Sequence, residues 1–263
     1  MVTRHALISG GSSGIGLAVA RRLARQGWRL TLLARRPDVL AQAAAELHEQ
    51  GAAAVLPLAV DVADAAACHA AVAQALAQGG APDLTLTCAG IARPDYFEAL
   101  TDADFHEAMA VNYFGTLHVL RAVLPALRAR RSGHVALMSS GAGLTGIFGY
   151  AAYAPSKFAV RGLAEVLRAE LKADGVGVSV VFPPDTDTPQ LAQENLTKPA
   201  ETRAIAGAAR VMSADAVAAA ILRGVERRRF VIAPGPEMGL LAPLHSLIAP
   251  LLRWQFDRAA RRA

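Results

Sequence analysis

Short apolar runs alternate with longer stretches rich in alanine, leucine and arginine along most of the chain. The apolar runs predict seven β-strands, near residues 5–9, 29–34, 53–59, 83–87, 133–138, 176–182 and 229–233. The longer stretches predict helices at about 14–27, 37–50, 64–78, 102–130, 153–174 and 213–227. Strands that are apolar on both faces and alternate with helices are typical of a parallel sheet covered on each side. The pattern therefore predicts one α/β domain, doubly wound, over residues 1–263.

Several predicted helix ends carry recognisable signals. Asp102 and Ser213 are expected to be N-caps, and Gly51 and Gly175 are expected to be C-terminal stops. Residues 183–212 differ from the rest because they are rich in proline, threonine, asparagine and glutamine. A long loop that follows the end of a strand is often a functional lid, so we expect a substrate loop at about 183–212.

The last part of the chain, at about 236–263, is both apolar and basic. Leucines recur between residues 240 and 252, and the arginines that follow are Arg253, Arg258, Arg261 and Arg262. Pro243 and Pro250 are expected to break this run, and no apolar stretch reaches the ~20 residues that a membrane-spanning helix needs. Two partners stay open for this segment: another subunit of an oligomer, or a membrane surface as a peripheral contact.

Composition narrows the class of protein. The chain has 263 residues, of which 53% are hydrophobic, and this is enough for a large buried core. The net charge is +5, but aromatic residues make up only 5% and the arginines are spread over the predicted helices, so no nucleic-acid partner is expected. Cys68 and Cys88 have no metal-like spacing, so no metal is expected. Since Met1 runs straight into apolar residues without a charged leader, we expect a cytoplasmic protein.

A glycine-rich turn lies between the first predicted strand and the first predicted helix. It reads Ser9-Gly10-Gly11-Ser12-Ser13-Gly14-Ile15-Gly16. Glycines at such a turn let backbone N–H groups approach phosphate oxygens at the positive end of a helix, as in Rossmann-type folds. The spacing differs from the commonest dinucleotide fingerprint, and a tight turn without a ligand is the alternative. The residues expected to bind a dinucleotide here are Gly10, Ser12, Ser13, Gly14, Ile15 and Gly16.

Three further strand ends extend this cofactor site. The second strand ends in Arg35 and Arg36, where an arginine suits the 2′-phosphate of NADP(H) and an acidic residue would suit NAD. We therefore expect NADP(H), held by Arg35, with Arg36 as surface charge at the helix start. Asp61-Val62 follows the third strand and is expected near the adenine, although Asp61 alone can equally be an N-cap. Ala89-Gly90 follows the fourth strand and is small enough to let the cofactor approach the backbone.

Tyr153 and Lys157 are one helical turn apart, so they share a face at the start of a helix. An ammonium beside a phenol stabilises the phenolate and lowers the phenol pKa from about 10 toward the working range. Ser140 ends the preceding strand, where its hydroxyl is placed to bind a substrate oxygen, and Asn112 is placed to hold a water that resupplies protons. Each residue taken singly has an ordinary packing or surface explanation. Lys157, however, is one of only three lysines in an arginine-rich chain.

Together these motifs resemble the short-chain dehydrogenase/reductase family over nearly the whole chain. The matching motifs are the glycine-rich turn, Cys88-Ala89-Gly90, Val111-Asn112-Tyr113, and Ser140 followed by Tyr153-Ala154-Pro155-Ser156-Lys157. The resemblance implies Tyr153 as general acid/base, Lys157 at the nicotinamide ribose, Ser140 at the carbonyl and Asn112 in a proton relay. It also implies that Pro183 and Thr188 contact the cofactor and that the protein is a homodimer or homotetramer. Thr87-Cys88 and Pro183-Pro184 depart from the family pattern, but neither departure removes a reacting group.

The segment from Phe182 to Thr202 is similar to the 3-ketodihydrosphingosine reductase subgroup of that family. This similarity implies that the substrate is a long-chain lipid ketone, 3-ketodihydrosphingosine, which NADPH reduces to dihydrosphingosine. The alternatives are a reductase of another bulky hydrophobic ketone or 3-ketoacyl substrate, and a non-catalytic dinucleotide-binding regulator. The intact set of four catalytic residues argues against the regulator.

A long acyl chain needs an apolar channel with few polar anchors. The residues expected to form it are Leu144, Ile147, Phe148 and Leu191. Asp185 and Asp187 are candidates for a contact with the cationic amine of a sphingoid base, although aspartate in a loop of this composition more often makes a local turn.

Overall fold

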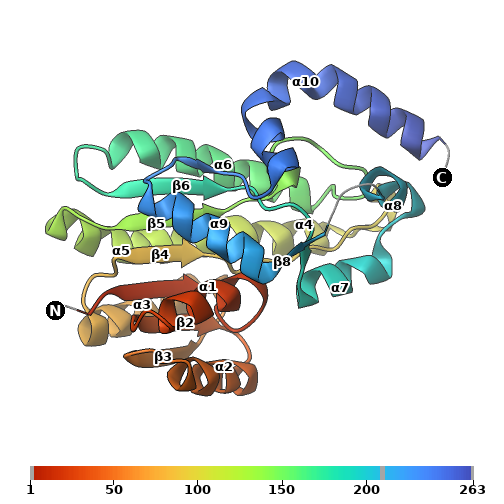
Figure 1. Ribbon diagram of the computed structural model, residues 1–263. Helices are drawn as coiled ribbons and strands as arrows, with labels where there is room; N and C mark the ends of the chain where they lie inside the picture. The colour runs from red at the N-terminus through yellow and green to blue at the C-terminus, as the bar shows by residue number, and fades with distance from the viewer. Residues whose placement is uncertain (1–2, 208–210, 262–263) are drawn as a thin grey trace.

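Seven strands form one parallel sheet in the computed structural model, which describes residues 3–207 and 211–261 (Figure 1). The strand order is β3-β2-β1-β4-β5-β6-β9. The strands are β1 (His5–Ser9), β2 (Arg29–Ala34), β3 (Ala54–Ala59), β4 (Leu84–Thr87), β5 (His134–Met138), β6 (Gly177–Val181) and β9 (Val231–Ile232). All seven predicted strands are therefore present, and the doubly wound, Rossmann-type α/β fold is confirmed.

The strand order changes direction at β1. The chain builds β1, β2 and β3 outward on one side and then crosses to β4, β5 and β6 on the other side of β1. Such a reversal leaves a crevice at the carboxyl ends of the two central strands, which is where open α/β sheets bind ligands. Here the two strand ends are tied together, since the backbone nitrogen of Cys88 donates to the carbonyl oxygen of Ser9 at 3.1 Å.

Six helices cover the two faces of the sheet. They are α1 (Gly14–Ala24), α2 (Pro37–Glu49), α3 (Ala65–Gly79), α5 (Gly115–Arg130), α6 (Tyr153–Glu170) and α9 (Ala214–Glu226). Leu7 of β1 packs with α3, α5 and α6 on one face, whereas its neighbours Ala6 and Ile8 pack with α1, α2 and α9 on the other. Successive residues of a strand point to opposite faces, so an apolar strand of this kind fills two cores at once.

The predicted helix at 102–130 is divided into α4 (Asp102–Ala108), a π-helical turn η2 (Met109–Phe114) and α5. Its N-cap is Thr101, so the prediction of Asp102 was wrong. Thr101 forms a capping box, in which its side chain accepts from the backbone nitrogen of Asp104 and the Asp104 carboxylate accepts in return. Ser213 is confirmed as the N-cap of α9, where it accepts from the backbone nitrogen of Ala216.

The substrate loop expected at about 183–212 contains regular helices and strands in its described residues, 183–207 and 211–212. They contain β7 (Thr186–Asp187), α7 (Pro189–Thr197), α8 (Ala200–Ala206) and the first residue of β8 (Met212–Ser213), which pairs with β7. Thr188 is the N-cap of α7 and accepts from the backbone nitrogen of Leu191 at 3.2 Å, with Pro189 at the first helical position. Proline and threonine thus start a helix here.

The C-terminal segment forms one long helix, α10 (Pro236–Ala260), so the expectation that Pro243 and Pro250 break the run was wrong. A proline inside a helix removes one backbone hydrogen bond and bends the helix, and Figure 1 shows α10 changing direction along its length. One part of α10 packs beside α8. Among the described residues, no helix is long and apolar enough to cross a membrane. Arg262, which the sequence assigned to this segment, lies outside the described residues.

Two short 3-10 turns, η1 (Phe97–Ala99) and η3 (Gly141–Gly143), complete the elements. The turn η3 follows β5 directly and Ser140 is its N-cap. The chain reaches the crevice again at this point, beside the start of α6.

Candidate active site

One cleft of about 560 Å³ lies over the carboxyl ends of the central strands and continues to the inner sides of α7 and α10. The predicted site residues that line it are Gly10, Ser12, Ser13, Gly14, Ile15, Arg35, Asp61, Val62, Ala89, Gly90, Ser140, Tyr153, Lys157, Pro183 and Thr188. Gly16 lies behind the turn, where a Cβ would collide with the carbonyl oxygen of Gly10. Asn112 is fully buried and also lies outside the lining.

The glycine-rich turn after β1 has the backbone geometry of a phosphate site. Gly10 and Gly14 have φ angles of 69° and 52°, in the left-handed region that favours glycine. A Cβ on Gly10 would lie 2.7 Å from the backbone nitrogen of Ala89 and would push the ends of β1 and β4 apart. Ser13, the N-cap of α1, makes no side-chain cap hydrogen bond, and the first turn of α1 has no acidic residue. The N–H groups of this helix end therefore suit an anion.

Arg35 and Arg36 line the outer end of the cleft after β2, and both are exposed. Within the part of the chain that the structure describes, neither guanidinium forms an ion pair. Asp61 accepts from the backbone nitrogen of Ala63 at 2.9 Å, whereas the N-cap of α3 is Asp64. The alternative that Asp61 caps the helix is therefore wrong, and Asp61 lines the cleft.

Cys88 lies at the floor of the cleft. Burial raises the pKa of its thiol to about 11, although the positive charge of Lys157 opposes the rise. The thiol is therefore protonated and a weak nucleophile at neutral pH. Across residues 3–207 and 211–261, no group of three His, Cys, Asp or Glu side chains is arranged to hold a metal ion.

Tyr153 and Lys157 project from the first turns of α6 into the middle of the cleft, opposite the end of β5. The Lys157 ammonium lies 5.4 Å from the centre of the Tyr153 ring and donates to the carbonyl oxygen of Met138 at 3.2 Å. Ser140 lines the cleft one residue beyond the end of β5, next to the same two side chains. The structure thus brings the three predicted residues together around one space.

The electrostatics of this group differ in one respect from the sequence expectation. Burial of the phenol, followed by the negative charge of Glu194, raises the pKa of Tyr153, while hydrogen bonds from Ser140 and Gln190 offset part of the rise. Burial also lowers the pKa of Lys157 to about 8. Burial of the phenol and the charge of Glu194 dominate the pKa of Tyr153 in the protein alone, so the expected lowering of this pKa by the Lys157 ammonium is not observed.

Asn112 lies in the π-helical turn η2 and its amide is fully engaged with the protein. It donates to the carbonyl oxygen of Ile91 at 3.0 Å and to the hydroxyl of Ser156 at 2.9 Å, and it accepts from the backbone nitrogen of Ile91 at 2.9 Å. A Cβ on Gly90 would lie 3.0 Å from the Asn112 amide oxygen and 3.3 Å from the Lys157 nitrogen. The Asn112 side chain therefore joins the segment after β4 to α6, and both of its N–H groups are used.

Several apolar residues line the inner end of the cleft. Ile147 and Leu191 line it as expected, but Leu144 and Phe148 do not: Leu144 is buried in the main core, and Phe148 packs against Tyr96 at 6.0 Å between ring centres. The apolar residues that sequence reasoning missed are Ile205 of α8 and Met238, Leu241, Leu252 and Phe256 of α10. The four residues of α10 could have been found from the sequence, because apolar residues at helical spacing in the C-terminal segment indicate one apolar helix face.

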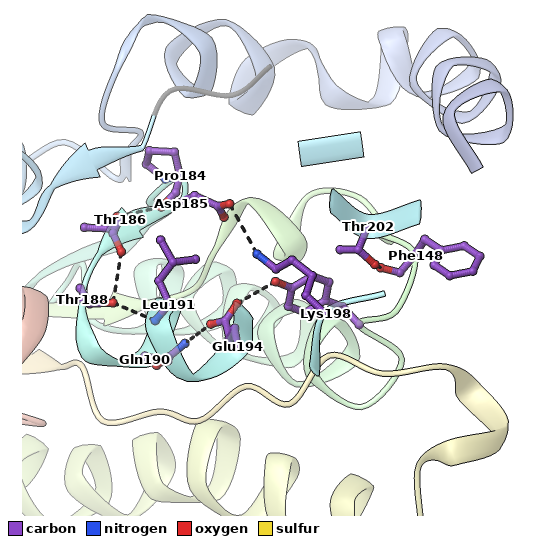
Figure 2. Close-up of polar contacts among 11 residues, drawn as sticks. Phe148, Pro184, Asp185, Thr186, Thr188, Gln190, Leu191, Glu194, Lys198 and Thr202 are labelled. Carbon is purple, nitrogen blue, oxygen red and sulfur yellow. Dashed lines mark hydrogen bonds and ion pairs between the residues drawn. The ribbon is translucent and has the colours of Figure 1, made fainter. Parts of the chain in front are cut away.

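Sequence reasoning also missed a polar cluster at this inner end (Figure 2). Glu194 of α7 is buried and lines the cleft, as do Gln190 and Lys198. Gln190 and Glu194 are four residues apart on one face of α7, and Lys198, four residues further along, is the C-cap of that helix. The spacing of four residues is visible in the sequence, but it indicates a shared face only if the segment is helical.

A parallel α/β sheet with a glycine-rich turn at its crevice, and with serine, tyrosine and lysine around the same cleft, is the architecture of a dinucleotide-dependent oxidoreductase. The family model for short chain dehydrogenases matches residues 4–199, and the chain belongs to this family.

Its curated relatives are similar over most of their length. The chain is 40% identical to 3-ketodihydrosphingosine reductase of Bos taurus over 251 residues, which is 94% of this chain and 76% of that protein. It is 38% identical to 3-dehydrosphinganine reductase of Danio rerio over the same shares of the two chains. Among solved structures, a short-chain dehydrogenase from Sphingobium yanoikuyae in complex with NADPH matches with a TM-score of 0.78 and 28% identity, covering 98% of this chain and 94% of that one.

Proposed function

We propose that the protein reduces 3-ketodihydrosphingosine to dihydrosphingosine with NADPH. The observation that carries this proposal is the 40% identity to the bovine 3-ketodihydrosphingosine reductase over 94% of the chain. The shape of the cleft agrees with it, because a dinucleotide turn, a Ser-Tyr-Lys group and an apolar end follow one another along a single space. A long alkyl chain fits the apolar end, which α7, α8 and α10 enclose.

The residues present fit NADPH, which supplies a hydride when bound. We propose that Gly10 and the turn at 12–16 hold the pyrophosphate, because the Ser13 side chain makes no cap hydrogen bond at the N-terminus of α1. Arg35 holds the 2′-phosphate, and Asp61-Val62 holds the adenine. At the other end, Ala89-Gly90, Pro183 and Thr188 form the walls beside the nicotinamide.

The protein's own groups deliver the proton. Tyr153 donates its phenolic proton to the ketone oxygen, and Ser140 donates a hydrogen bond to the same oxygen. Lys157 binds the nicotinamide ribose and places a positive charge beside the phenol, which favours loss of the phenolic proton. Asn112 acts as a positioning residue, since its amide holds the segment after β4 against α6.

Purified protein with NADPH and 3-ketodihydrosphingosine tests the proposal through the loss of NADPH absorbance. We expect turnover that depends on Tyr153 and falls by about 10²- to 10⁴-fold in Tyr153→Phe, the usual worth of a general acid. Tyr113→Phe is the matched control, because Tyr113 lies outside the cleft. The contrary result is a protein that binds NADPH and turns over a steroid-like or 3-ketoacyl ketone but not 3-ketodihydrosphingosine. That result would reject the proposed substrate and retain the proposed class of reaction.

We also propose that the outer face of α10 lies on an anionic lipid surface. Leu240, Leu247, Leu251 and Trp254 are exposed apolar residues of this helix. Basic side chains follow them, and the opposite face of α10 lines the cleft, so a lipid substrate has a short path from membrane to site. Flotation with anionic vesicles that is lost in Leu247→Glu supports this contact. A dimer that Leu247→Glu dissociates would assign the face to a second subunit instead.

The oligomeric state is proposed as a homodimer or homotetramer. Phe114, Phe158 and Val166 are exposed apolar residues on η2 and α6, and they supply a second face for subunit contact. Light scattering of the eluted peak in gel filtration measures the mass, and a monomer at micromolar concentration would contradict this proposal.

A further inference from the structure

Glu194 places a buried carboxylate at the substrate end of the cleft. Its residue is 7% exposed, and it lines the cleft from α7. One carboxylate oxygen accepts from the Tyr150 hydroxyl at 2.7 Å and the other from the Gln190 amide at 2.8 Å, as Figure 2 shows in part. A carboxylate can accept about four hydrogen bonds, so these two neutral donors leave half of its hydrogen-bonding capacity unused and bring no opposite charge.

Such a charge is costly in a dry site unless a cation faces it. Among the described residues, Glu194 forms no ion pair with lysine or arginine. Lys198 is buried nearby, but its ammonium is 3.8 Å from the carboxylate of Asp185. Asp185, Glu194 and Glu237 line the cleft on this side, and the charge of Glu194 also raises the pKa of Lys157 in the middle of the cleft. Among the described lining residues around Tyr153 and α7, these three carboxylates outnumber the two ammonium groups of Lys157 and Lys198.

The carboxylate is also close to the reacting group. The rings of Tyr150 and Tyr153 are 5.6 Å apart between centres, and Tyr150 donates to Glu194. Gln190 hydrogen-bonds Glu194 and also acts on the Tyr153 phenol. The charge of Glu194 also acts on the Tyr153 phenol, so a group held by Glu194 would lie on the same side of the cleft as a carbonyl held by Tyr153.

We propose that Glu194 binds an ammonium group that the substrate carries next to its ketone, and so selects amino ketones over neutral ketones. The inference rests on the proposed function, since 3-ketodihydrosphingosine carries its amine on the carbon beside the carbonyl. Asp187, which the sequence also suggested for this contact, is exposed and outside the lining, and Asp185 already faces Lys198.

Binding of the ammonium has a second effect on the same site. The negative charge of Glu194 raises the pKa of Tyr153. A bound cation neutralises that charge, so the phenol becomes a better proton donor when the correct substrate is present. A ketone without an amine leaves the carboxylate unpaired and the phenol less acidic.

The test compares a long-chain primary amine with the primary alcohol of equal chain length, bound to the NADPH-loaded full chain and measured by calorimetry. We expect the wild-type protein to bind the amine about 10- to 100-fold more tightly, the factor of a charge-assisted hydrogen bond in a buried site. Glu194→Gln should bring the two affinities within about 3-fold, while Glu194→Asp, which keeps the charge, retains part of the preference. Asp187→Asn is the matched control and should behave as wild type.

Two results overturn the inference: equal affinity of the wild-type protein for amine and alcohol, or a preference that survives in Glu194→Gln. The wild-type comparison holds even where a variant does not fold. The outcome is also separable from the proposed function. An amine preference that depends on Glu194, without turnover of 3-ketodihydrosphingosine, rejects the reaction and keeps the ammonium site. Turnover without such a preference rejects the ammonium site alone.

Discussion

Replacement of Arg35 tests how the protein selects its cofactor. Arg35 follows β2 at the outer end of the cleft, and its guanidinium is exposed with no ion pair among the described residues. Arg35→Ala removes a cation that can approach the 2′-phosphate of NADPH, a group that NADH lacks. Arg36→Ala removes the same charge one residue later and is the matched control.

The expected change in the KM for NADPH depends on how strongly solvent weakens the interaction between Arg35 and the 2′-phosphate. Two unit charges about 4 Å apart interact by roughly 1 kcal/mol in water and roughly 4 kcal/mol near a protein surface, before screening by salt. A hydrogen bond to a charged group is worth about 1.5–3 kcal/mol, so Arg35→Ala should raise the KM for NADPH about 10- to 100-fold. The KM for NADH should change by less than about 2-fold, and the effect on NADPH should shrink as salt is added.

The assay is steady-state reduction of the ketone at several concentrations of each cofactor. The informative quantity is the ratio of kcat/KM for NADPH to that for NADH, since general damage to the fold lowers both values together. Equal losses with the two cofactors in Arg35→Ala, or a larger change of the ratio in Arg36→Ala, would refute the assignment of Arg35.

Three further predictions follow from buried contacts. Gly90→Ala puts a Cβ 3.0 Å from the Asn112 amide oxygen and 3.3 Å from the Lys157 nitrogen, so overpacking should destabilise the protein by about 1–3 kcal/mol and lower kcat at least about 10-fold. An unchanged kcat would contradict this. Lys157→Met should abolish activity and yet stabilise the cofactor-free protein, because folding lowers the pKa of Lys157 from 10.5 to about 8. At pH 7 the gain is up to about 3 kcal/mol, reduced by the loss of the hydrogen bond to Met138. Between about pH 8 and pH 10.5 the Lys157 amine is protonated in the unfolded chain but not in the folded one, so the stability of the wild type rises with pH. The difference in the free energy of unfolding between Lys157→Met and wild type should therefore shrink as pH rises. A constant difference from about pH 7 to pH 10, measured by chemical denaturation, would contradict this. Thr202→Val removes the hydrogen bond at 2.8 Å that joins α8 to the carbonyl oxygen of Phe148, and should destabilise the docking of α8 by about 1 kcal/mol. We expect faster proteolysis within α8 with unchanged global unfolding, and unchanged proteolysis would contradict this.

The fold was predictable because the buried strands carry a local signal. Each strand from β1 to β6 is a short apolar run between turn residues, and the strand ends fix which side chains meet at the crevice. For this reason Arg35, Ser140 and Tyr153 could be placed in one cleft from sequence, although they come from distant parts of the chain. The topology of a parallel sheet brings them together whatever the loop details are.

The segments after β6 were not predictable in the same way. Thr188 and Pro189 are residue types that favour a turn as well as the start of a helix. In the structure they start the helix α7. In α10, Pro243 lies inside the helix because the apolar packing of one face outweighs the lost hydrogen bond. Glu194 could not be recognised as a cleft residue from sequence, because only the orientation of α7 in the structure places it in the cleft lining.

The most direct test of the account follows the transferred hydrogen. NADPH that carries deuterium at the position of hydride transfer is incubated with the protein and 3-ketodihydrosphingosine, and the product is analysed by mass spectrometry. We predict dihydrosphingosine with a single deuterium on the carbon of the former ketone, formed about 10²- to 10⁴-fold more slowly by Tyr153→Phe. Absence of the labelled product, or equal rates for wild type and Tyr153→Phe, would contradict the claim that this cleft reduces the ketone with Tyr153 as proton donor.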